Sequence, residues 1–72
     1  MQRQRCFKLG IVAAGLKNYQ VAERANELLP PSQHLTEQAI SKIITGRLRP
    51  SSLQKETLGR VLERGVIELF DC

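Results

Sequence analysis

The sequence predicts an all-α domain, a compact bundle of four or five helices, and three observations support this. Apolar residues recur at helical spacing almost throughout, and no useful length alternates as a strand would. Glycines and prolines divide the chain into segments of helical length. The 72 residues contain no internal repeat or linker and suffice for one core. Residues 1–72 are therefore predicted to be one domain.

The first two helices are bounded by strong stop signals. One is predicted over residues 4–14, with Phe7, Ile11 and Ala14 on its apolar face and Gly15 as its stop, and Leu16 then packs back onto that face. The next starts at Asn18, a good N-cap residue, and ends before Pro30, because a residue preceding proline is disfavoured in a helix. Residues 30–35 then form a loop. The apolar stripe of the second helix consists of Val21, Ala22, Ala25, Leu28 and Leu29.

The third helix is predicted over residues 36–45, and the sequence marks both of its ends. Thr36 is a suitable N-cap, Glu37 suits the positive end of the helix dipole, and Gly46 stops the helix. A fourth helix opens at residues 50–51 and is interrupted by Gly65, and residues 66–70 form a last short helix. The predicted core-facing residues of the third helix are Ala39, Ile40, Ile43 and Ile44, and those of the fourth are Leu53, Thr57, Leu58, Val61 and Leu62.

The polar face of the third helix is chemically specific. It consists of Glu37, Gln38, Ser41, Lys42 and Thr45. Gln pairs with the adenine edge, Lys donates to guanine and Glu accepts from cytosine, so these residue types suit the DNA major groove. A surface helix without a partner is the alternative, although such a face is more often filled with Glu, Lys and Arg.

Charge is distributed unevenly. Residues 1–49 hold eight Lys or Arg and three Glu, whereas residues 50–72 hold three Lys or Arg and four acidic residues. The positive part contains the third helix, and a basic surface attracts a polyanion such as DNA, although ordinary solubilising charge is the alternative. Arg3 and Arg5 belong to a predicted flexible arm, residues 1–5, that either frays or enters a minor groove.

Other functional classes find little support. His34 lies in the predicted loop without an acid, cysteine or second histidine at ligand spacing, so we expect no metal site, no cofactor and no enzyme. Cys6 and Cys72 show no C-x-x-C pattern and are expected to be reduced thiols. No apolar run spans a bilayer and no secretory signal is apparent, so we expect no membrane partner, no small-molecule substrate and a cytoplasmic location.

The run L-K-N-Y-Q-V-A-E-R-A, followed by T-E-Q-A-I-S-K-I-I-T-G-R-L-R-P, resembles the helix-turn-helix of phage repressor and Cro-type regulators, the lambda-repressor-like family. The resemblance extends over residues 7–70, and its most specific part is the spacing of Thr36, Ile40, Gly46 and Pro50. Here the turn between the two motif helices is longer than in the family. The resemblance implies a compact bundle whose third helix enters the major groove.

The resemblance also implies roles for individual residues. Base readout would fall to Glu37, Gln38, Ser41 and Lys42, with Thr45 at the margin. Phosphate contacts would fall to Lys17, Asn18 and Gln20, and to Arg47 and Arg49. Tyr19 either donates its hydroxyl to a phosphate or covers the first turn of its helix.

The expected function is sequence-specific regulation of transcription in the bacterial cytosol or nucleoid. A homodimer would bind double-stranded operator DNA, as a phage or prophage repressor or a Cro-like protein does. One alternative is a protein-interaction module on the same bundle, such as an antitoxin or adaptor, which the apolar tail V-I-E-L-F-D-C would suit. The other is a nonspecific architectural DNA-binding protein.

Overall fold

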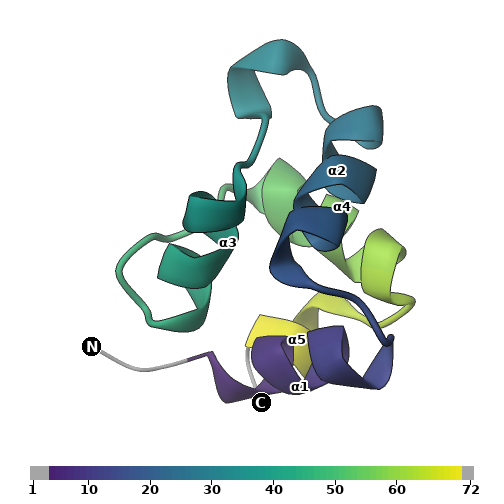
Figure 1. The fold of residues 1–72 in the computed structure, drawn as a ribbon. Coiled ribbons are helices and arrows are strands. Elements are labelled where there is room, and N and C mark those ends of the chain that lie inside the picture. The colour runs from purple at the N-terminus through teal and green to yellow at the C-terminus, as the bar shows by residue number, and fades with distance from the viewer. Residues whose placement is uncertain (1–3, 71–72) are drawn as a thin grey trace.

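Five α-helices and one short 3₁₀ turn follow one another in the computed structural model, which describes residues 4–70 (Figure 1). They are α1 (Arg5–Ala13), α2 (Asn18–Leu28), η1 (Pro31–Gln33), α3 (Glu37–Ile44), α4 (Ser52–Leu62) and α5 (Val66–Phe70). No strand occurs in these described residues, so the all-α prediction is confirmed.

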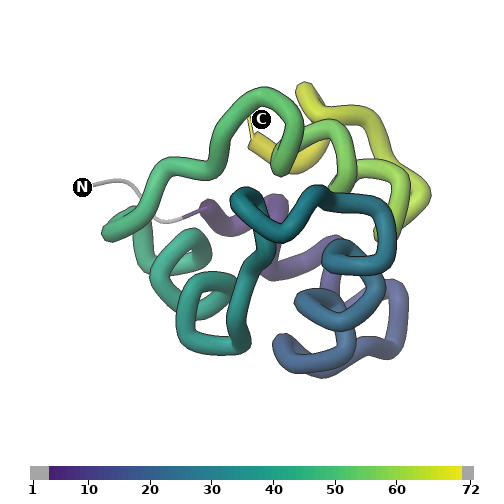
Figure 2. Tube along the Cα trace, turned by 90° about the horizontal axis from the view of Figure 1, so that it is seen from above, coloured from purple at the N-terminus to yellow at the C-terminus, as the bar shows by residue number. Residues whose placement is uncertain are grey.

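The helices pack around one apolar core. α2 packs against both α3 and α4, and α1 packs against α3 and α5. Seen from above, α2 and α3 lie side by side and the chain between them crosses the top of the bundle (Figure 2). The largest fully buried side chains come from all five helices and are Phe7, Ile11, Val21, Ile40, Ile43, Leu58 and Leu69.

The short helix α5 closes the base of the bundle against α1. Leu69 is fully buried, and a Cβ atom placed on Gly10 would lie only 2.8 Å from Leu69 Cδ2. Beside this contact the rings of Phe7 and Phe70 lie 5.2 Å apart at 32°. α5 therefore approaches α1 at a position where any side chain larger than hydrogen is crowded.

Most predicted helix ends are confirmed, and four details are wrong. Asn18 is the first residue of α2 and not its N-cap, because Lys17 occupies that position and Gln20 Oε1 accepts the Lys17 N–H at 2.8 Å. Ala14, Leu28 and Leu53 are predicted to be apolar core positions, but all three are exposed, Leu28 at 57% and Leu53 at 45%. All three lie at helix ends, since Ala14 is the C-cap of α1, Leu28 is the last residue of α2 and Leu53 lies in the first turn of α4.

The two ends of the chain require two further corrections. Arg5 is the first residue of α1, so the predicted arm over residues 1–5 is wrong at that position, and residues 1–3 lie outside the described residues. Cys6 is disulfide-bonded, so the expectation of a reduced thiol is wrong there, and Cys72 lies outside the described residues.

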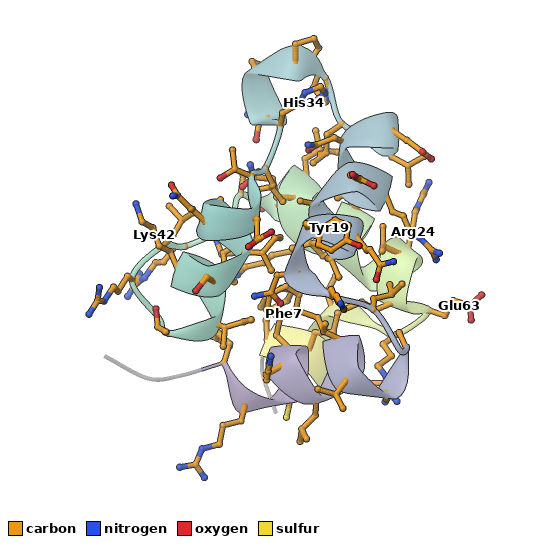
Figure 3. The ribbon with its side chains drawn as sticks, in the orientation of Figure 1. Phe7, Tyr19, Arg24, His34, Lys42 and Glu63 are labelled. Atoms are coloured by element: carbon orange, nitrogen blue, oxygen red, sulfur yellow. The ribbon has the colours of Figure 1, made fainter. Side chains whose placement is uncertain are left out.

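The segment between α2 and α3, residues 29–36, is an ordered connection and is called the connecting segment below. Leu29 and Leu35 are buried, which anchors both of its ends in the core. His34 lies on this segment at the top of the molecule (Figure 3), and its Nε2 donates to the Leu29 carbonyl at 3.1 Å. The imidazole therefore satisfies a carbonyl just beyond the end of α2, where no further helical turn supplies a donor.

Candidate nucleic-acid interface

α3 separates a buried apolar side from an exposed polar side. Ile40 and Ile43 are fully buried, and Ala39 and Ile44 are half-buried against the core. All five side chains predicted to read bases are exposed, namely Glu37, Gln38, Ser41, Lys42 and Thr45. Lys42 points away from the bundle on the α3 side of the molecule (Figure 3). The predicted reading residues therefore lie together on one accessible helix face.

Both ends of α3 are fixed by local hydrogen bonds. Thr36 Oγ1 accepts the Ala39 N–H at 3.0 Å, which is the predicted N-cap. At the other end Gly46 adopts a left-handed φ of 80°, and the Arg47 N–H reaches the Lys42 carbonyl at 2.8 Å. The Thr45 hydroxyl also donates to that carbonyl, at 3.2 Å, which leaves Thr45 with less capacity to donate to a base.

The chain leaves α3 as an exposed basic segment. Arg47 and Arg49 are both exposed, and neither they nor Lys42 form an ion pair within residues 4–70. Because these cations are not neutralised by carboxylates of the described chain, they remain available to phosphate groups.

The second group of predicted contacts lies at the start of α2. Lys17 and Tyr19 are exposed, whereas Asn18 and Gln20 are half-buried. The Gln20 N–H donates to the Lys17 carbonyl at 3.0 Å, whereas the Asn18 and Tyr19 N–H groups have no partner in the first turn, so this end of α2 presents two backbone donors to an anion. Gln20 uses its carbonyl oxygen on the Lys17 N–H, which leaves the side-chain NH₂ as a further donor.

A surface groove joins the beginnings of α2 and α3. It is lined by Lys17, Asn18 and Tyr19, by Glu37 at the first turn of α3, and by Leu16 and Lys8. The fold therefore brings the predicted phosphate-contacting end of α2 next to the predicted reading helix. The Glu37 carboxylate lowers the positive potential of this groove.

Lys8 is a further basic residue of this groove, outside the contacts predicted from the sequence. It lies on α1, is exposed, and lines the same groove as Lys17 and Glu37. No motif or spacing in the sequence marks Lys8, because only the packing of α1 against the other helices brings it to the groove. Its positive charge is the one signal present in the sequence.

Two other features of the described residues bear on the sequence predictions. No three His, Cys, Asp or Glu side chains within residues 4–70 lie close enough to hold a metal ion. None of the helices described is both long and apolar enough to cross a membrane.

Comparisons with protein-family models, with curated proteins and with solved structures found no match to this chain.

Proposed function

We propose that this chain is a sequence-specific DNA-binding regulator of transcription, of the phage repressor or Cro kind, with α3 as its recognition helix. The observation that carries the proposal is the exposed polar face of α3. The side chains of Gln38, Ser41 and Lys42 are exposed on a helix whose opposite side is buried in the core. The exposed Arg47 and Arg49 follow this helix directly. In this proposal α2 and α3 form a helix-turn-helix with a lengthened turn in a lambda-repressor-like bundle.

The mechanism has three physical parts. Lys8, Lys17, Arg47 and Arg49 attract the duplex, because neutralising phosphates releases condensed counterions. The N–H groups at the start of α2 then hold one phosphate and fix the register of the protein on the duplex. Finally α3 lies in the major groove, where base edges are distinguishable by their donors and acceptors.

A homodimer is part of the proposal. One α3 helix of eight residues reads only a few base pairs, so two copies on a palindromic site would multiply the discrimination. Exposed apolar side chains suitable for self-association are present on α1 and α5, since Leu9, Val12 and Ile67 are 65%, 61% and 71% exposed. Cytosolic bacterial operators are the proposed targets.

Selection of bound sequences from a random duplex pool tests the proposal. A palindromic preferred sequence is expected, and enrichment of no sequence would refute specific recognition. Gel shifts on preferred and random duplexes would then separate two residue classes. Gln38→Ala should lose about 1–3 kcal/mol on the preferred sequence alone. Arg47→Ala should weaken both complexes and reduce the slope of log K against log salt by about 0.9 for each copy bound.

A protein-interaction module, such as an antitoxin or adaptor, is the second candidate. Its support is the exposure of Ile67 on α5 and of Leu9 and Val12 on α1, three apolar side chains outside the proposed DNA face. The two functions respond differently to low salt, where a basic DNA-binding domain binds any duplex. Absence of duplex binding at low salt would favour the interaction module.

A further inference from the structure

Asn26 on α2 pairs with the backbone of a single residue in the connecting segment. Its Oδ1 accepts the Leu35 N–H at 2.7 Å, and its Nδ2 donates to the Leu35 carbonyl at 2.7 Å. Leu35 is buried and directly precedes Thr36, the N-cap of α3. The Asn26 amide therefore fixes the backbone immediately before α3 begins.

The connecting segment is also tied to the chain that follows α3. The Ser51 hydroxyl donates to Gln33 Oε1 at 2.9 Å, and Gln54 Nε2 donates to the Gln33 carbonyl at 2.9 Å. Ser51 is the N-cap of α4 and comes directly after the basic segment 47–50. The connecting segment is thus hydrogen-bonded at two places. One is Leu35, directly before α3, and the other is Gln33, which contacts the start of α4 directly after the basic segment 47–50.

We propose that Asn26 is a positioning residue for DNA recognition, which sets the direction of α3 relative to α2 through its two hydrogen bonds to Leu35. This inference rests on the proposed function. A short turn between two helices restricts their angle by its length alone, whereas a longer connection needs additional contacts to do so. With Asn26 in place, the base-facing side chains of α3 and the phosphate-facing end of α2 meet the same duplex together.

The predicted consequence is a loss of sequence discrimination without a matching loss of general affinity. Asn26→Ala removes both hydrogen bonds, whereas Asn26→Asp retains the acceptor for the Leu35 N–H and loses the donor. Dissociation constants are measured for the preferred and random duplexes. For Asn26→Ala the ratio between them should fall about tenfold, equivalent to about one base contact, while random-duplex affinity stays within about twofold. Asn26→Asp should give a smaller fall.

Two controls separate positioning from charge and stability. Ser32→Asp adds the same charge as Asn26→Asp at an exposed position of the connecting segment and should leave the ratio unchanged. Amide NMR spectra of the Asn26 variants should show shifts around Leu35 and in α3, while Phe7 and Leu69 in the base of the bundle keep their positions.

The outcomes distinguish this inference from the proposed function. If the wild-type chain selects no preferred sequence, both are overturned. If it does and the Asn26 variants keep the wild-type ratio, or lose affinity equally for both duplexes, only the positioning role is overturned. Failure of both variants to fold would make Asn26 a residue required for stability and would also overturn it.

Discussion

The effect of Gly10→Ala on the free energy of unfolding should depend on residue 69, because Gly10 of α1 lies against Leu69 of α5. In wild type, Gly10→Ala places a methyl group 2.8 Å from Leu69 Cδ2, and Leu69 is fully buried, so its side chain has little space in which to move. Overpacking of this kind costs about 1–3 kcal/mol. The higher helix propensity of alanine offsets about 1 kcal/mol of this. The net expectation is a loss of up to about 2 kcal/mol.

The same substitution should stabilise a Leu69→Val background. Valine lacks the δ-carbons, so the crowding is relieved and the alanine methyl fills part of the space left behind. Leu69→Val alone should cost about 1 kcal/mol, the typical value for deleting one buried methylene. Adding Gly10→Ala should then recover about 1 kcal/mol through helix propensity. The coupling between the two sites is therefore about 1–3 kcal/mol.

Urea unfolding followed by far-UV circular dichroism measures all four members of this cycle. Gly59→Ala is a matched control, because its Cβ would lie 2.7 Å from the Arg64 backbone oxygen, which truncation of Leu69 does not relieve. Gly59→Ala should show the same effect in both backgrounds. A coupling between Gly10 and Leu69 below about 0.5 kcal/mol would refute the packing described for α5.

Three further predictions concern the ends of helices and the charge of the interface. Thr36→Ala should lower the free energy of unfolding by about 1 kcal/mol through loss of the α3 N-cap, while Thr36→Ser should retain it, both by urea unfolding. Gly46 and Glu63 both adopt left-handed φ values, 80° and 56°, so Gly46→Ala should destabilise and Glu63→Gly should stabilise, each by about 1 kcal/mol in thermal melts. Glu37→Gln should raise affinity for random DNA in gel shifts, because it removes a negative charge from the groove that contains Lys8; unchanged or weaker binding would contradict this.

The sequence predicted α3 well because the signals that define α3 are local. Thr36 caps its start and Gly46 ends it, as expected. The start of α2 was misplaced by one residue, because Lys17 is a poor capping residue by type and the glutamine side chain three positions later satisfies its N–H instead. The preference of residue types for the N-cap position does not reveal a cap in which a side chain three positions later accepts the N-cap N–H.

The remaining features depend on contacts between distant residues. Asn26 reaches Leu35 nine positions away, and Gln33 reaches Ser51 eighteen positions away, so no periodicity indicates that the connecting segment is tied down. Lys8 joins the groove of Lys17 only through helix packing. Leu28 is likewise exposed at the last residue of α2, and the apolar pattern of α2 does not indicate that its final apolar side chain lies outside the core.

The side chains of Gln38, Ser41 and Lys42 form no hydrogen bond with any other part of the chain that the structure describes. The fold therefore does not depend on their identity, and replacing them should leave the bundle intact. Under the proposed function, these three residues can therefore change, and new DNA targets be acquired, while the bundle stays folded. A library randomised at these positions should accordingly contain mostly folded members, whose differences lie in what they bind.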